Sequence, residues 1–228
     1  MNNDELLLLN NYKAGLSQRA LSDITHFSLG KVNKLLSSLK EQGFIDTKGN
    51  LANEKVNELK VKNAIILAAG PGLRMLPISD EAPKQLLNVK GEILIERMIE
   101  QLKEKGINNI AIVVGFKKEQ FEYLIDKYSV KLVVNKDYGK DSNLRSLFLA
   151  AKYIDNSYII PGDLYFYDNP FNKYELNSYY TLSTKERMTG FFYVDKKGNL
   201  MIGKNKFYDA IGMTFINIEE TCHSLFCG

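Results

Sequence analysis

The chain has 228 residues, of which 45% are hydrophobic and 25% are charged, so it has the composition of a globular protein with one large or two modest domains. Its formal net charge of +3 is too small to indicate a nucleic-acid or membrane partner. No run approaches the roughly 20 apolar residues of a membrane span, and the N-terminus lacks the features of a secretory leader, so we expect a cytoplasmic protein without a membrane partner.

The first 60 residues predict short helices followed by a small hairpin. Leu6–Leu9 indicate the first helix, and Ser17 and Ser28 are suited to cap the next two. Residues 44–51 then predict a hairpin that turns at Lys-Gly-Asn. We therefore expect a separate first domain over residues 1–60.

The string from Leu16 to Ile45 resembles the winged helix-turn-helix modules of MarR-type regulators. In such modules the third helix enters the major groove, so the resemblance implies DNA as a partner of residues 1–60. The residues that would face DNA are Lys31, Asn33, Lys34 and Ser37. Lys and Arg outnumber Asp and Glu by only eight to seven in this segment, so protein contact or a vestigial role is the alternative.

From residue 61 to 228 we expect a second domain in which strands alternate with helices. The predicted strands are 64–67, 110–114, 131–135 and 158–160. The predicted helices are 91–102, 118–127 and 142–152, the last with Leu144, Leu147, Phe148 and Ala151 facing inward. This alternation predicts an α/β fold, with a mainly parallel, doubly wound sheet flanked by helices that binds ligands at the carboxyl ends of its strands.

The loop after the first of these strands has the residues of a phosphate-binding turn. Small residues that leave the backbone N–H groups accessible follow Leu67, namely Ala68, Ala69, Gly70 and Gly72. The glycines also allow positive φ. Arg74 supplies a guanidinium fork for bidentate phosphate contact, and Lys84 supplies a point charge. The alternative is a simple tight turn, because the spacing matches neither the P-loop nor the dinucleotide fingerprint.

Asp163 follows Pro161-Gly162 at the end of the last predicted strand. A carboxylate at this edge of the sheet suits Mg²⁺, which prefers hard oxygen ligands and neutralises phosphates. The alternative is that Asp163 is an ordinary turn residue.

The string Leu67–Met75 with Pro77, followed by Pro83–Leu87, resembles the signature of nucleotidyltransferases that activate sugar phosphates and phosphocholine. Residues 62–216 are most similar to the bacterial phosphocholine cytidylyltransferases, and the further matching segments are 95–97, 114–124 and 142–147. The resemblance implies a Rossmann-like nucleotidyltransferase sheet. It also implies a Mg²⁺-dependent reaction in which phosphocholine attacks the α-phosphate of CTP and yields CDP-choline and pyrophosphate.

The resemblance also implies roles for individual residues. Arg74, Lys84 and Asp163 would be catalytic, with Asp163 as the metal ligand. The nucleotide would be bound by Leu67, Ala68, Ala69, Gly70, Gly72, Arg74 and Lys84.

The sequence departs from the resembled family in two respects. The tryptophan of the family is missing, and the aromatic residues that could replace it around a quaternary ammonium are Tyr165, Phe166, Tyr167 and 191–193. The family's second metal-binding acidic residue lies beyond the region equivalent to 211–215, and the chain stops soon afterwards. We therefore expect a C-terminally truncated second domain with reduced catalysis.

Two alternative functions remain open. One is a DNA-binding regulator that senses a nucleotide or a choline metabolite through a degenerate transferase domain. The other is a nucleotidylyltransferase that acts on a sugar 1-phosphate with UTP or dTTP.

Overall fold

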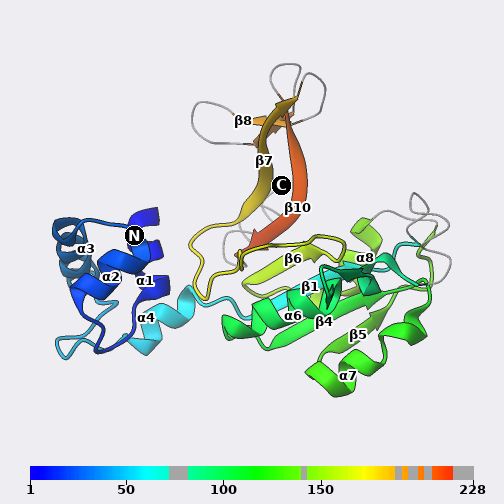
Figure 1. Ribbon diagram of the computed structural model, residues 1–228, viewed down its shortest axis with the longest axis horizontal. Coiled ribbons are helices and arrows are strands. Elements are labelled where there is room, and N and C mark those ends of the chain that lie inside the picture. The colour runs from blue at the N-terminus through cyan, green and yellow to red at the C-terminus, as the bar shows by residue number, and fades with distance from the viewer. Residues whose placement is uncertain (72–81, 140–142, 188–191, 195–199, 203–206, 218–228) are drawn as a thin grey trace.

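The computed structural model describes residues 1–71, 82–139, 143–187, 192–194, 200–202 and 207–217. The first helices are α1 (Asn3–Asn11), α2 (Gln18–Thr25), α3 (Leu29–Glu41) and α4 (Asn53–Glu58). They lie together at one end of the molecule (Figure 1). We refer to residues 1–60 as the N-terminal module.

Side chains at the helix starts explain why these helices begin where they do. The side chains of Ser17 and Ser28 accept hydrogen bonds from the N–H groups of Ala20 and Lys31, which confirms both predicted caps. Residues 44–51 form the predicted hairpin turn, closed by an antiparallel bridge between Ile45 and Leu51.

The remaining chain alternates strands and helices, as predicted. Its strands are β1 (Asn63–Ala68), β2 (Asn88–Val89), β3 (Glu92–Ile93), β4 (Asn109–Val114), β5 (Lys131–Val134), β6 (Ser157–Pro161), β7 (Tyr179–Arg187), β8 (Phe192–Val194), β9 (Leu200–Ile202) and β10 (Phe207–Ile216). Its helices are η2 (Lys84–Leu86), α6 (Leu94–Glu104), η3 (Lys118–Phe121), α7 (Tyr123–Tyr128), α8 (Asn143–Leu149) and η4 (Ala151–Tyr153).

Within the described residues, six strands form the main sheet in the order β5-β4-β1-β6-β10-β7. The first four are parallel, and β10 runs antiparallel to both β6 and β7. The chain passes from β1 outward to β4 and β5 and then returns to place β6 on the other side of β1. The strand order therefore reverses between β1 and β6, where doubly wound sheets open a crevice for ligands.

Both faces of the parallel strands are buried. Along β1, Ala64, Ile66 and Ala68 pack in a core with α6, η3 and α7, whereas Ile65 packs on the opposite face against Leu147 and Ala150. This two-sided burial explains why the strands appear in the sequence as continuous apolar runs.

The predicted inward face of helix 142–152 is only partly correct. Leu147 packs against the core as predicted, whereas Leu144, Phe148 and Ala151 are exposed. Leu144 and Phe148 are 73% and 69% exposed, and Ser146 is buried instead. The amide nitrogen of the buried Asn135 donates to the Ser146 hydroxyl at 3.0 Å, so a polar contact selects the helix face that meets the sheet. Apolar periodicity alone could not register that contact.

Beyond the sheet, β7 and β10 continue together as a long arm that rises away from the other strands, with β8 near its tip (Figure 1). The long pairing runs from Phe215 opposite Tyr179 to Phe207 opposite Arg187, with register shifts between these ends.

The N-terminal module is joined to the sheet region by the segment 173–175. Lys60 bridges to Tyr174, whose ring is buried in the core of the module. The Asn10 side chain both donates to the Tyr174 carbonyl and accepts from its N–H, each at 2.9 Å. The segment is therefore held through backbone bonds and through a buried ring.

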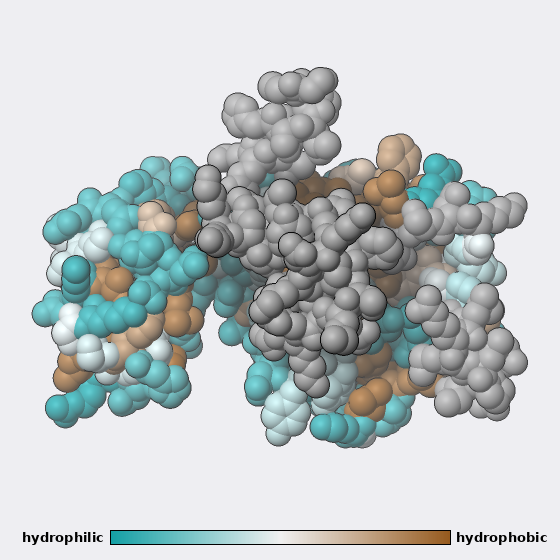
Figure 2. All heavy atoms as spheres, turned by 90° about the horizontal axis from the view of Figure 1, so that it is seen from above, coloured by the Kyte–Doolittle hydropathy of each residue, from teal (hydrophilic) through white to brown (hydrophobic). Residues whose placement is uncertain are grey.

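On the face seen in Figure 2, the N-terminal module is mainly hydrophilic, with hydrophobic residues between the polar ones. None of the helices in the described ranges combines the length and the apolar character that a membrane crossing requires.

Candidate active site

The loops after β1 and β6 meet at the switch point of the sheet. Leu67 pairs with Pro161 in register, and the N–H of Gly162 donates to the Leu67 carbonyl at 2.9 Å. The structure thus brings the start of the predicted phosphate-binding loop and Asp163 to the same edge, because parallel strands end on one side of a sheet. Gly72 and Arg74 lie outside the described residues.

Lys84 and Asp163 form the central ion pair of this edge. The Lys84 Nζ atom lies 2.5 Å from Asp163 Oδ2, and the two side chains are 25% and 41% exposed. Lys84 comes from η2, which packs against β6 at its end. Both charged groups are therefore accessible to a ligand while they neutralise each other.

Gly162 allows η2 to lie this close to β6. A Cβ atom at residue 162 would lie 3.0 Å from Gln85 Cγ and 3.1 Å from the Leu67 carbonyl oxygen. Gln85 is buried, and its Oε1 atom has no hydrogen-bond partner among the described residues. The absence of a side chain at residue 162 thus favours close packing below the Lys84–Asp163 pair.

The small residues after Leu67 have different roles in the structure. Ala68 and Ala69 are buried, and the Ala69 carbonyl accepts a hydrogen bond from Phe116 N at 3.1 Å. Gly70 is exposed, and nothing lies within 4 Å of the position of its missing Cβ. Its φ is not in the left-handed region, so the expected positive-φ turn is not formed at Gly70, which contributes open space beside the backbone instead.

The ends of β4 and β5 add residues for which no role was predicted from the sequence. A Cβ at Gly115 would lie 2.6 Å from Tyr138 Cβ and 2.8 Å from the Ala69 carbonyl oxygen. Asn135 accepts from Asp137 N at 3.0 Å and so fixes the turn that carries Tyr138. The available signal was a glycine directly after a buried strand, which indicates a close approach of backbone segments.

The tyrosines expected around a quaternary ammonium are engaged elsewhere. The Tyr165 ring lies 5.1 Å from the Arg97 guanidinium and 5.6 Å from Lys90 Nζ, and Tyr167 lies 5.2 Å from the same Lys90 atom. Phe166 packs against the core beside Phe171. In this structure these rings therefore contact the chain's own cations and core, and residue 191 lies outside the described residues.

The donor set at this edge suits a magnesium ion that shares its ligands with a nucleotide. Across the described ranges, no three His, Cys, Asp or Glu residues cluster as a metal site. Asp163 is a single accessible carboxylate, and Mg²⁺ is commonly held by one or two carboxylates while phosphates and water complete its shell. Asp163 would hold such an ion.

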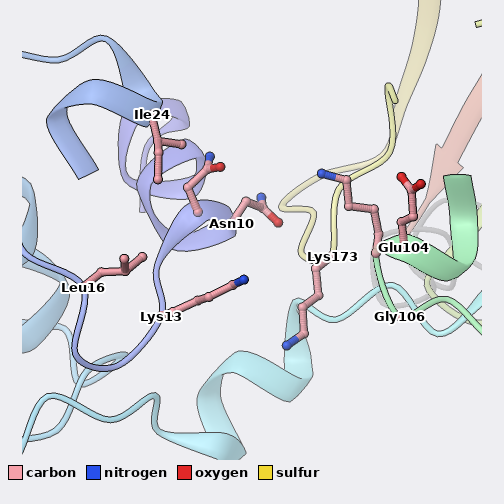
Figure 3. A pocket seen from close by; sticks show the side chains of 9 residues that line it. Asn10, Lys13, Leu16, Ile24, Glu104, Gly106 and Lys173 are labelled. Atoms are coloured by element: carbon pink, nitrogen blue, oxygen red, sulfur yellow. The ribbon is translucent and has the colours of Figure 1, made fainter. Parts of the chain in front are cut away.

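A hollow of about 560 Å³ lies between the N-terminal module and the C-terminal end of α6 (Figure 3), and Asp163 is not among the residues that line it. Lys13 follows the C-terminal end of α1, and Lys105 caps the C-terminal end of α6. Cations at these positions compensate the negative ends of two helix dipoles.

Known proteins with similar sequences and structures share the sheet region. Choline-phosphate cytidylyltransferase of Streptococcus pneumoniae is 40% identical over 160 residues, which are 64% of this chain and 70% of that protein. The 2-aminoethylphosphonate cytidylyltransferase of Lancefieldella rimae is 38% identical over 117 residues, which are 50% of this chain and 48% of that protein.

The solved structure of CTP:phosphocholine cytidylyltransferase from Streptococcus pneumoniae has a TM-score of 0.62 and 38% identity to this chain. The match covers 70% of this chain and 72% of that protein. The sheet region therefore has the Rossmann-like nucleotidyltransferase fold. Residues 64–211, more than half of the chain, match the family model of the MobA-like NTP transferase domain. The chain is a transferase enzyme that belongs to the MobA-like NTP transferase domain family.

Proposed function

We propose that the chain transfers a cytidylyl group from CTP to a small phosphorylated acceptor, with phosphocholine as the first candidate, in a Mg²⁺-dependent reaction. The observation that carries the proposal is the Lys84–Asp163 pair at the switch point, beside the backbone of Leu67–Gly70. A cation and a metal-binding carboxylate are the groups that phosphoryl-type transfer needs.

The relatives support the nucleotide more firmly than the acceptor. The names of both relatives contain cytidylyltransferase, whereas one acts on choline phosphate and the other on 2-aminoethylphosphonate. We therefore infer CTP as the donor and a small molecule with a phosphate or phosphonate group as the acceptor. Phosphocholine is the first choice because the more extensive match is to a choline-phosphate enzyme.

The chemistry requires positioning and charge neutralisation more than covalent catalysis. An oxygen of the acceptor phosphate forms a bond to the α-phosphorus of CTP, and the bond to the β-phosphate breaks so that pyrophosphate leaves. Mg²⁺ held by Asp163 would supply charge neutralisation at the phosphates. Lys84 would then exchange its contact with Asp163 for one with the nucleotide phosphates, and Arg74 is the further candidate cation.

The test is pyrophosphate release with Mg²⁺, each nucleoside triphosphate and three acceptors: phosphocholine, 2-aminoethylphosphonate and glucose 1-phosphate. We expect release with CTP and one of the first two acceptors. The Asp163→Asn variant should lower kcat by about 100-fold or more, since it weakens the only proposed metal ligand.

Asp168→Asn is the matched control, because Asp168 is an exposed carboxylate in the same loop. Full activity in Asp163→Asn would refute the metal role. Release with UTP or dTTP and glucose 1-phosphate alone would replace this function with the sugar-1-phosphate alternative.

DNA binding by the N-terminal module stays a second, separate prediction. Asn33, Lys34 and Ser37 are exposed on α3, whereas Lys31 pairs with Asp4 at 2.8 Å and lies over the Phe27 ring. If the module is a regulator, duplex DNA should bind in a salt-dependent manner that Lys34→Glu abolishes and Lys105→Glu does not. Equal binding by both variants would contradict this role for α3.

A further inference from the structure

Helix α6 holds the segment that follows Asp163. Arg97 Nε donates to the Phe166 carbonyl at 2.9 Å, and another guanidinium nitrogen donates to the Tyr167 carbonyl at 2.6 Å. One turn later, Gln101 Nε2 also donates to the Phe166 carbonyl, at 3.2 Å. The Asn169 side chain completes the attachment by donating to the Gln101 carbonyl at 2.8 Å.

The same helix is attached to the segment that carries Lys84. The N–H of Leu94, the first residue of α6, donates to the Leu87 carbonyl at 3.1 Å, directly after η2. The third guanidinium nitrogen of Arg97 donates to Glu92 at 2.5 Å, and Glu92 belongs to the β2–β3 hairpin between η2 and α6. Arg97 thus contacts both chain segments that lead to the Lys84–Asp163 pair.

Each of the three guanidinium nitrogens of Arg97 donates a hydrogen bond. They donate to two carbonyls and one carboxylate, the central guanidinium carbon lies 5.1 Å from the centre of the Tyr165 ring, and the side chain is only 20% exposed. A lysine ammonium is a point charge without a planar fork, so it could not make these contacts together. This geometry requires arginine specifically.

We infer that Arg97 is a positioning residue that fixes the distance between Asp163 and Lys84 by bracing residues 165–167 against the β2–β3 hairpin. The inference rests on the proposed function only for its catalytic consequence. Residues that orient a metal ligand typically change metal affinity or activity by 10–100-fold when they are removed, although they never touch the metal.

We refer to the contacts of Arg97 with residues 165–167 and with Glu92 as the brace, and two measurements test it. Hydrogen exchange of the peptide spanning residues 162–169 should accelerate in Arg97→Met, and less so in Arg97→Lys. Mn²⁺, used as a spectroscopic stand-in for Mg²⁺ and titrated with CTP present, should bind about 10-fold more weakly to Arg97→Met. In the activity assay kcat should fall more than the KM for CTP rises, because the hydrogen bonds of Arg97 go to residues 92, 166 and 167, on the segments next to Lys84 and Asp163.

Lys105→Met is the matched control, because it removes a cation from the end of the same helix without touching residues 164–169. Unchanged hydrogen exchange in Arg97→Met would overturn the brace. A lower Tm with unchanged Mn²⁺ affinity would reduce Arg97 to a structural residue and overturn the positioning role.

A different result would refute the proposed metal role of Asp163. If the wild type and Asp163→Asn bind Mn²⁺ equally, Asp163 is not the metal ligand, while faster exchange in Arg97→Met would still establish the brace. If Arg97→Met does not fold, Arg97→Lys decides the question by the same two readouts.

Discussion

Glu5 joins two helices of the N-terminal module through one buried carboxylate. One oxygen accepts from the Ser38 hydroxyl at 2.6 Å and from the Gln42 amide at 3.0 Å, and the other accepts from Asn2 N at 2.7 Å. Burial raises the pKa of Glu5, but the hydrogen bonds from Ser38, Asn2 and Gln42 outweigh it and leave the pKa below its ordinary value. The ionised form is therefore the one that the fold stabilises.

We expect Glu5→Gln to lower the free energy of unfolding by about 1–2 kcal/mol at neutral pH, because an amide cannot accept charge-assisted bonds at both ends. A lowered pKa in the folded state gives stability above the unfolded pKa of about 4.3, and this stability is lost as pH falls through the folded pKa. Urea unfolding at several pH values between 3 and 7 measures this dependence. The free energy of unfolding should fall less steeply toward low pH in the variant than in the wild type.

Glu41→Gln is the control for this experiment, because Glu41 is an exposed carboxylate at the end of α3. Parallel pH curves for the wild type and Glu5→Gln would contradict the assignment.

At the scale of elements, β6 connects the candidate active site with a buried hydrogen-bond network near its start. Its carboxyl end leads to Asp163, and near its start the buried Tyr158 hydroxyl donates to Glu175 at 2.5 Å and accepts from Asn172 N at 3.0 Å. Tyr179, the first residue of β7, donates to the same Glu175 oxygen at 3.1 Å. One carboxylate thus ties the central strand to the chain that continues into the arm.

Tyr158→Phe should lower the free energy of unfolding by about 2–3 kcal/mol, because it removes one hydrogen bond to a charged group and leaves Asn172 N without its partner. Burial, followed by the nearby Tyr179 and Glu175, raises the pKa of Tyr158 above its ordinary value. Stability from this group is present below the unfolded pKa of about 10 and is lost as pH rises further. Above pH 10, the free energy of unfolding should therefore fall less steeply with rising pH in the variant than in the wild type.

The exposed Tyr180, in β7, gives the control variant Tyr180→Phe. An equal loss of stability in both variants would show that the buried network contributes nothing specific.

For the whole molecule, the decisive feature is that two hydrophobic cores share one connecting segment. Tyr174 belongs to the core of the N-terminal module, while its neighbour Glu175 belongs to the network at the start of β6. The backbone bonds Val61 N to Lys173 O at 3.0 Å and Glu175 N to Leu59 O at 2.9 Å continue this connection. The two cores should therefore unfold together.

Scanning calorimetry should give one transition for the wild type and two for Tyr174→Ala, since losing a buried aromatic ring costs about 3–5 kcal/mol and releases the module from the sheet region. Tyr174→Phe keeps the ring and should behave like the wild type. A single transition at lower temperature in Tyr174→Ala would mean that the module depends on other contacts.

Local chemistry in the sequence determined most elements. The caps at Ser17 and Ser28 follow from side chains that bond to the next turn, and the buried strands follow from continuous apolar runs. The order of strands and helices also predicted where the chain would bind a ligand, because parallel strands must end at one edge. Lys84 and Asp163 could be selected for that reason, together with their resemblance to a family signature.

Tertiary structure alone decided which groups meet across long sequence distances. The face that α8 turns to the sheet depends on the hydrogen bond between Asn135 and Ser146. The glycine at residue 115 is explained by the close approach of Tyr138. Arg97 binds two carbonyl groups that lie 69 and 70 residues further along the chain. A sequence pattern registers the periodicity and capping of one element at a time. Contacts between polar side chains and distant backbone groups leave no such pattern, so only the packed fold could specify them.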